Sequence, residues 1–225
     1  MRGSVVDIFD EVNEDLRAER AQALFKRYGG LLVGFALLVI AAAGGWQAWQ
    51  WWQTKRDMAA ATAFLSAMNT AQAVGPASDA ASRTAAIAAF DQVAATAPDG
   101  YRTLARLRAA ALKADAGDLA GATALYDQVA ADSAADPLLR DLASLLWAQR
   151  QLDSGDPARL EARLKVLAEP DNPWHALATE DLALLDLRQG RTDAAKATLR
   201  RLAGDVTLPQ DLRGRASGLL NRLGG

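Results

Sequence analysis

Very few side chains in this chain of 225 residues could do chemistry. There is one histidine, His175, and there is no cysteine. The carboxylates that could act with His175 in acid–base chemistry are the pair Glu180 and Asp181 and the later Asp205. A single imidazole without thiolates leaves little material for a metal centre or for Cys-His or Ser-His catalysis. We interpret the carboxylates as solvated or capping groups and His175 as a surface or packing residue. We predict no enzyme activity, no cofactor and no small-molecule substrate.

The composition favours a helical protein without a nucleic-acid partner. Twenty-five Lys and Arg residues against 27 Asp and Glu residues give a formal net charge of −2. Nucleic-acid binding requires a clustered positive surface, which this balance does not supply. Alanine accounts for 51 residues, and aromatic residues for only 6%. Because alanine is the best helix former and a poor strand former, these values predict an all-α fold.

One uncharged segment, residues 28–54, is long enough to cross a membrane. Its apolar centre, residues 29–46, would extend roughly 27 Å as a helix, and the hydrocarbon core of a bilayer is about 30 Å thick. Aromatic and basic residues stand at both ends, where they suit the headgroup level. The predicted interface residues are Lys26, Arg27 and Tyr28 before the segment, and Trp46, Trp49, Trp51, Trp52, Lys55 and Arg56 at its end.

Two other interpretations of this segment were weighed. A buried core helix seldom runs so long without a charge. A cleaved signal peptide is the stronger rival, because residues 31–40 resemble its apolar region and Ala41–Ala43 a cleavage site. However, about thirty residues with several acids precede the segment, whereas the start of a signal peptide is normally short and positive. A retained transmembrane helix is therefore the preferred prediction.

Basic residues near the two ends predict the orientation. Four precede the segment, and only two follow closely; they are Arg17, Arg20, Lys26 and Arg27, then Lys55 and Arg56. Positive residues favour the cytoplasmic side. Residues 1–27 are thus predicted to be cytoplasmic, and residues 55–225 to lie in the periplasm of a bacterium, beyond its inner membrane.

The N-terminal residues show helical periodicity with acids on the other face. The apolar positions, three or four residues apart for the most part, are Val5, Ile8, Phe9, Val12, Leu16, Ala23 and Leu24. The segment is either a short solvated helix or a helix that docks on a cytoplasmic protein. Its acidity disfavours attraction to anionic lipid.

After the apolar segment the sequence repeats. Residues 90–96 (FDQVAAT) recur as residues 126–132 (YDQVAAD), 36 residues later. Three glycines, Gly117, Gly155 and Gly190, precede related patterns at five, nine and twelve residues beyond each one. Those positions hold Ala122, Tyr126 and Val129 in one copy, Leu160, Leu164 and Leu167 in the next, and Ala195, Leu199 and Leu202 in the last. An earlier copy has Ala86, Phe90 and Val93, and Pro98 closes it.

These offsets place the three positions on one face of a helix that follows a reversal at the glycine. Each hairpin buries little alone, so neighbouring hairpins must stack. The sequence predicts an α-solenoid of about four helix pairs over residues 57–208 and a capping helix over residues 209–223. A loop is predicted around residues 75–79. An irregular α-bundle is the alternative.

The pattern resembles the tetratricopeptide repeat (TPR), whose second helix carries A-x3-F followed by Pro. Ala86, Phe90 and Pro98 match it, and so do Ala122 and Tyr126, whereas Leu160 replaces the small residue. The Trp and Leu-Gly signature of the first helix is largely missing, so the repeats are TPR-like and degenerate.

Together, the acidic N-terminus, the apolar segment with its Trp-rich exit, and the repeats resemble the YfgM-like family. Its members are single-pass inner-membrane proteins ancillary to the SecYEG translocon. The resemblance implies a membrane-anchored scaffold that links the translocon to periplasmic chaperones such as PpiD. An envelope adaptor for cell division or outer-membrane assembly is the alternative function.

A cationic stripe is the predicted partner surface. Arg102, Arg106 and Lys113 fall on successive turns of one predicted helix, and Arg108 is close by. They could form part of a concave surface for a protein partner. A solvated helix face is the alternative.

Overall fold

The structure, a computed structural model, describes the backbone of residues 6–74 and 79–224 and side chains from Lys26 onward within these ranges. Over these residues the chain forms helices and no strand, which confirms the all-α prediction. Residues 75–78 of the predicted loop and all side chains of the predicted N-terminal apolar stripe lie outside the described part of the chain.

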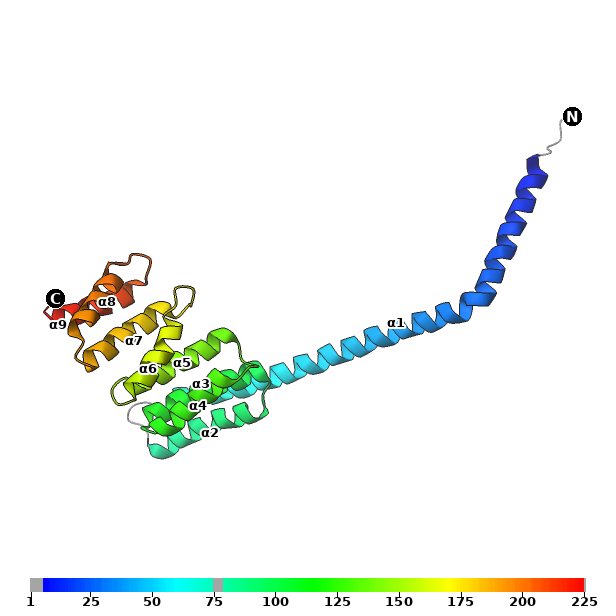
Figure 1. The fold of residues 1–225 in the computed structure, drawn as a ribbon. Coiled ribbons are helices and arrows are strands. Elements are labelled where there is room, and N and C mark those ends of the chain that lie inside the picture. The colour runs from blue at the N-terminus through cyan, green and yellow to red at the C-terminus, as the bar shows by residue number, and fades with distance from the viewer. Residues whose placement is uncertain (1–5, 75–78, 225) are drawn as a thin grey trace. The chain divides into compact units, whose positions relative to one another are not determined.

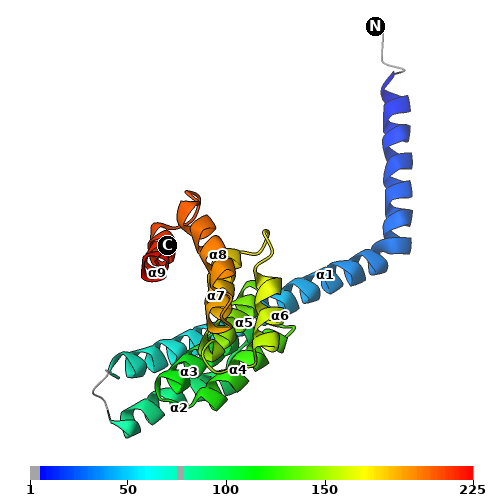
Figure 2. The same ribbon diagram turned by 60° about the vertical axis from the view of Figure 1, so that its left-hand side comes forward.

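Nine helices follow one another along the described chain (Figures 1 and 2). Their bounds are α1 Val6–Gln72, α2 Ala80–Thr96, α3 Asp99–Asp115, α4 Leu119–Ala131, α5 Pro137–Gln151, α6 Pro157–Leu167, α7 His175–Arg188, α8 Thr192–Gly204 and α9 Gln210–Arg222. The chain divides into two compact units, Met1–Lys55 and Arg56–Gly225.

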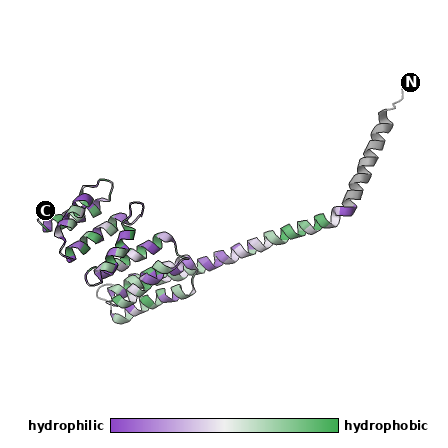
Figure 3. Cartoon of the chain, in the orientation of Figure 1, coloured by the Kyte–Doolittle hydropathy of each residue, from purple (hydrophilic) through white to green (hydrophobic). Residues whose placement is uncertain are grey.

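The first unit consists of the N-terminal part of α1, where the apolar run is visible in Figure 3. Between Lys26 and Lys55, its large apolar side chains are exposed; Leu31 is 71% exposed, Phe35 68% and Ile40 67%. The helix is long and apolar enough to cross a membrane, and the most apolar window has a mean hydropathy of 2.0. None of that window is buried within the described protein, unlike the core helix of a soluble domain.

In the second unit each helix from α2 to α9 packs against the next one, and α5 also contacts α3 and α7. The part of α1 beyond Lys55 joins α2 and α3 around Phe64, whose ring lies 5.6 Å from Phe90 and 5.9 Å from Tyr101. The pairs are thus the end of α1 with α2, α3 with α4, α5 with α6, and α7 with α8. Helix α9 covers the last pair, so the predicted solenoid and capping helix are confirmed.

Aspartates begin several of these helices. The side chains of Asp79, Asp118, Asp136 and Asp156 accept hydrogen bonds from backbone N–H groups in the first turns of α2, α4, α5 and α6, respectively. Pro137 and Pro157 follow the last two, at a position where the missing N–H costs nothing. Together these residues fix where each hairpin starts.

The three predicted turn glycines act in two different ways. Gly117 and Gly190 have φ of 86° and 77°, a left-handed conformation that favours glycine. Gly155 does not have a positive φ. Instead, its N–H donates to the carbonyl of Gln151 at 2.7 Å, and a Cβ at Gly155 would lie 2.9 Å from that oxygen. At Gly155 the constraint is therefore close approach of backbone, not backbone conformation.

The second helices bury the positions that follow the glycines. The residues at five, nine and twelve beyond Gly117, Gly155 and Gly190 are all 5% exposed or less, as are Ala86, Phe90 and Val93 in α2. Leu160 is fully buried beside Leu164 and Leu167 in the central core, so this hairpin accommodates a large residue where the others have alanine. Pro98 precedes α3 and is half-buried.

Candidate protein-interaction surface

The first helices of the hairpins share a pattern that is counted backwards from the same glycines. At twelve and seven residues before each glycine stands an alanine, and all six of these alanines are fully buried: Ala105, Ala110, Ala143, Ala148, Ala178 and Ala183. Small residues let helices approach closely, and α5 indeed contacts both α3 and α7. The first helices of successive hairpins therefore lie side by side.

A second set of positions, at thirteen, nine and six residues before each glycine, falls within one narrow stripe of the first helices. We call it the first-helix face; it comprises Leu104, Arg108 and Ala111 in α3, Leu142, Leu146 and Gln149 in α5, and Leu177, Asp181 and Leu184 in α7. Leu104, Arg108 and Gln149 are exposed, and most of the others are half-buried. Five leucines, at least one on each first helix, with Ala111 and three polar residues among them suit an extended or helical protein segment.

The predicted cationic stripe lies elsewhere on α3. With 100° per residue, Arg102, Arg106 and Lys113 point away from the side that carries Leu104 and Arg108. All three pair with carboxylates of the chain itself, namely with Asp99 at 2.5 Å, Asp132 at 3.1 Å and Asp91 at 3.8 Å, respectively. Their side chains are only 29%, 26% and 23% exposed. Because its cations are already neutralised, this stripe has little left to offer a partner.

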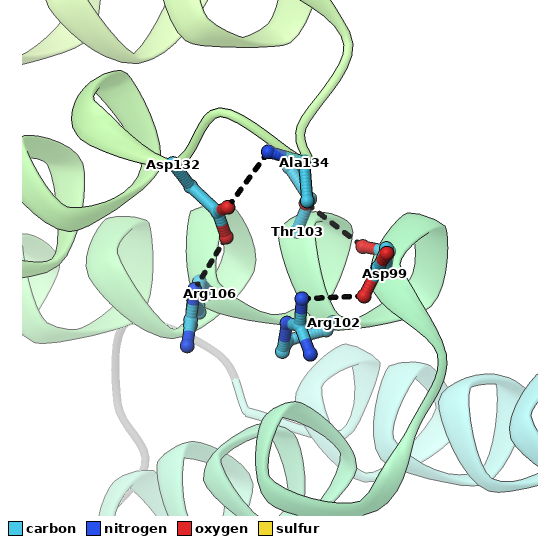
Figure 4. Close-up of polar contacts among 6 residues, drawn as sticks. All are labelled: Asp99, Arg102, Thr103, Arg106, Asp132 and Ala134. Atoms are coloured by element: carbon cyan, nitrogen blue, oxygen red, sulfur yellow. Dashed lines mark hydrogen bonds and ion pairs between the residues drawn. The ribbon is translucent and has the colours of Figure 1, made fainter.

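Figure 4 shows two of these ion pairs, Arg106 with Asp132 and Arg102 with Asp99. Arg106 reaches from α3 to Asp132 at the end of α4, and the other Asp132 oxygen accepts the N–H of Ala134 at 3.0 Å. Arg102 binds Asp99 one turn earlier on the same helix. These contacts position the α4–α5 connection relative to α3.

Asp127 connects two neighbouring hairpins. One carboxylate oxygen accepts the indole N–H of Trp147 at 3.1 Å, and the other accepts from Arg163 at 2.7 Å. Arg159 lies 3.6 Å from the same carboxylate, and the guanidinium groups of Arg163 and Arg159 stand 4.0 and 4.7 Å from the centre of the Trp147 ring. Charge, hydrogen bonding and cation–π attraction thus act together on α4, α5 and α6.

Contacts about one repeat apart tie the later hairpins in the same way. Trp174 donates its indole N–H to the carbonyl of Leu138, 36 residues earlier, at 3.1 Å. Arg188 donates to the carbonyls of Leu152 and Gly155 at 2.7 and 2.5 Å. Such links fix the spacing between successive first helices, and with it the first-helix face.

The carboxylate pair of α7 lies in one cavity. Glu180 is 6% exposed and accepts two hydrogen bonds from the guanidinium of Arg215 in α9, at 2.6 and 3.0 Å. Asp181 is 5% exposed, and burial raises its pKa to about 7 despite a hydrogen bond from Gln149. Both line a cavity of about 730 Å³ between α5, α7 and α9.

His175 and Asp205 lie at a different cavity, of about 590 Å³, beside α6, α7 and α8. Asp205 follows α8 and accepts hydrogen bonds from the N–H and hydroxyl of Thr207 at 2.9 and 2.6 Å, which lower the pKa of its carboxyl. The structure therefore separates His175 from Glu180 and Asp181. Within residues 26–74 and 79–224, no three His, Asp or Glu side chains form a group that could hold a metal ion.

The predicted interface residues flank the apolar part of α1. Lys26 and Arg27 are exposed, and the Arg27 guanidinium lies 5.7 Å from the centre of the Tyr28 ring. Trp46 and Trp49 have ring centres 5.5 Å apart, and the Lys55 ammonium stands 3.9 Å over Trp51. Trp52 is 52% exposed, and Arg56 begins the second unit.

Stacked helical hairpins, with small residues where the first helices lie side by side, define an α-solenoid repeat protein. Residues 22–145, more than half of the chain, match the family described as "Tetratricopeptide repeat-like domain". The chain therefore belongs to the tetratricopeptide repeat-like family, and its domain is of the kind that serves as a scaffold for protein–protein interactions. No match was found among curated proteins. None was found among solved structures either.

Sequence reasoning located the core of the second helices and missed the first-helix face. The signal was present in the same three glycines. Counting backwards from Gly117, Gly155 and Gly190 aligns Leu104, Leu142 and Leu177, one leucine in each first helix. The neighbouring helices pack on the side of the buried alanines beside these leucines. Which residues are buried is seen only in the structure.

Proposed function

We propose that this protein is a membrane-anchored scaffold that binds protein partners through its first-helix face. The observation that carries the proposal is the row of exposed and half-buried leucines along α3, α5 and α7, from Leu104 to Leu184. Half-buried leucines on neighbouring first helices leave apolar surface that a partner can bury. Fixed spacing between the hairpins lowers the entropy cost of binding.

The apolar part of α1 is the proposed anchor. An apolar window of eighteen residues, none of it buried and with Leu31 and Ile40 among its exposed side chains, would be unfavourable in water, whereas a lone helix in lipid satisfies all its backbone groups. The family match begins at residue 22 and includes this segment, which supports a retained helix over a cleaved signal peptide. By the distribution of basic residues, the N-terminus would be cytoplasmic and the repeats periplasmic, at the inner membrane.

The proposed partner is the SecYEG translocon, with the repeats linking it to periplasmic chaperones such as PpiD. This assignment rests on the resemblance of the anchor region and its Trp-rich exit to the YfgM-like family. Anchoring supports it physically, because a tethered domain reaches a high local concentration beside another membrane complex. Repeats alone determine shape and leave the partner open.

Affinity purification tests the proposal directly. The tagged full-length chain is solubilised from native membranes with a mild detergent, and the co-purifying proteins are identified. We expect translocon subunits and a periplasmic chaperone. Cell-division or outer-membrane assembly proteins in their place would favour the envelope adaptor, and full-length protein that consistently purifies alone would contradict a scaffold.

Matched charge reversals then locate the surface. Arg108→Glu changes the first-helix face, and Arg200→Glu changes an exposed position of the second helix α8. We expect Arg108→Glu to reduce partner recovery several-fold and Arg200→Glu to leave it unchanged, with equal thermal stability. Equal recovery with both variants would move the partner away from the first-helix face.

A further inference from the structure

The cavity between α5, α7 and α9 continues the first-helix face at its C-terminal end. Leu177, Leu184 and Leu219 give it apolar walls, and its volume is about 730 Å³. Gln149 and Arg222, both exposed, stand at its edge. Its size and lining suit one or two side chains of a bound protein segment, not a whole helix.

Asp181 is the unusual group in this cavity. Its side chain belongs to a residue that is 95% buried, and its Oδ2 atom has no hydrogen-bond partner within the described residues. A buried carboxylate without full pairing is costly in a folded protein. No basic side chain of the described chain forms an ion pair with it, although cations stand nearby.

The nearest guanidinium is already committed. Arg215 binds both oxygens of Glu180 and also lies 3.5 Å from Asp211, so its hydrogen bonds are directed away from Asp181. Burial raises the pKa of the Asp181 carboxyl most, the Gln149 side chain lowers this pKa, and the charge of Glu180 raises it. The protein itself therefore leaves one buried acceptor oxygen, of a residue that lines this cavity, unsatisfied.

We propose that this cavity receives a lysine or arginine side chain of the protein partner, which ion-pairs with Asp181. The methylene stem of such a side chain would pack against the three leucines while its charged end reaches the carboxylate. Because Asp181 is the carboxylate of this lining that no cation of the described residues pairs with, it favours a basic residue over an acidic or purely apolar one. The partner motif would be a basic residue flanked by apolar residues. The inference rests on the proposed scaffold function and specifies the chemistry of its partner.

A peptide comparison tests the inference. The full-length chain in mild detergent is titrated into fluorescent peptides with leucine and alanine flanks and one central residue, either Lys, Arg, norleucine or Glu. We expect the Lys and Arg peptides to bind about tenfold tighter than the norleucine peptide. One hydrogen bond to a charged group typically contributes such a difference in affinity. The preference should weaken at pH 6 compared with pH 8, as Asp181 becomes protonated.

Two variants make the test specific. Asp181→Asn keeps the shape of the side chain and should abolish the preference for Lys and Arg, whereas Asp211→Asn, at an exposed carboxylate of α9, should preserve it. Circular dichroism must show both variants folded. No binding of the Lys peptide, equal binding of all peptides, or a preference that persists in Asp181→Asn would overturn the inference.

Failure here is distinguishable from failure of the scaffold. If Asp181→Asn recovers the same partners from membranes as the unchanged protein, the scaffold stands and the basic-residue site is wrong. If neither form recovers a partner, the scaffold function itself fails.

Discussion

At the scale of single residues, the stability of the repeats depends on a few polar groups between hairpins. The Asp127 carboxylate accepts hydrogen bonds from Trp147 and Arg163 of the next hairpin. The Glu180 carboxylate accepts hydrogen bonds from Arg215 of α9. A buried donor that loses its acceptor keeps its full desolvation cost, so each removal should destabilise more than the bond itself contributes. Asp181 differs from these two carboxylates, because its Oδ2 has no hydrogen-bond partner within the described residues.

We predict that Asp127→Ala lowers the free energy of unfolding by about 1–2 kcal/mol, since it leaves Arg163 and the Trp147 N–H without their acceptor. The control is Gln128→Ala at the adjacent, exposed position of α4, which should change stability little. Thermal denaturation of both full-length variants, followed by circular dichroism, measures the difference. Equal melting temperatures would show that Asp127 does not join the hairpins.

Asp181 should make stability fall as the pH rises. Its carboxyl has a pKa of about 7 in the folded protein and 3.8 as the ordinary value, so the folded state holds a proton that the unfolded state releases between these pH values. The contribution of Asp181 to the free energy of unfolding is then highest below about pH 4, decreases up to about pH 7 and is constant above that pH. With about 1.4 kcal/mol for each pKa unit, the loss is on the order of 4 kcal/mol.

Asp181→Asn removes this titration. We predict that the variant is more stable than the unchanged protein at pH 8, and that the two differ least near pH 4. Denaturant unfolding of the full-length chain at both values gives the comparison. A variant that is less stable at pH 8 would mean that the ionised carboxylate has a partner within the protein.

At the scale of elements, the turns and caps decide where each helix ends. We predict that Gly117→Ala destabilises the protein by about 1–2 kcal/mol, because an alanine is strained at a φ of 86°. Gly214→Ala is the matched control inside α9, where a Cβ would meet nothing within 4 Å, and alanine should stabilise by about 0.5–1 kcal/mol. Opposite changes in melting temperature are expected, and a loss in both would contradict this reading of the turn.

The second helices and their buried faces are the features that the sequence predicts best. Offsets from Gly117 and Gly190 placed the second helices and their buried faces, because a regular period needs no knowledge of the neighbours. The offsets from Gly155 hold as well, although its backbone needs space and not the left-handed conformation of Gly117 and Gly190. It could not assign Arg106 either, since the Asp132 that neutralises it comes from another helix, 26 residues away. Pairing between elements is invisible to a pattern within one element.

At the scale of the whole molecule, the chain combines an apolar helix and a repeat domain of opposite character. The first exposes leucine, phenylalanine and isoleucine freely, whereas the second buries alanine and leucine at every helix crossing. In the proposed arrangement, lipid covers the first and water surrounds the second. The proposed binding surface is the first-helix face, which the repeats hold in place.

Site-specific photo-crosslinking in native membranes tests the central claim most directly. A photoreactive residue is placed at Leu104, Arg108 or Gln149 on the first-helix face, and at Gln128, Ala162 or Ala197 on exposed positions of the second helices. The scaffold account predicts a discrete membrane-protein adduct from the first set and none from the second. Adducts of equal yield from both sets, or only from the second helices, would contradict it.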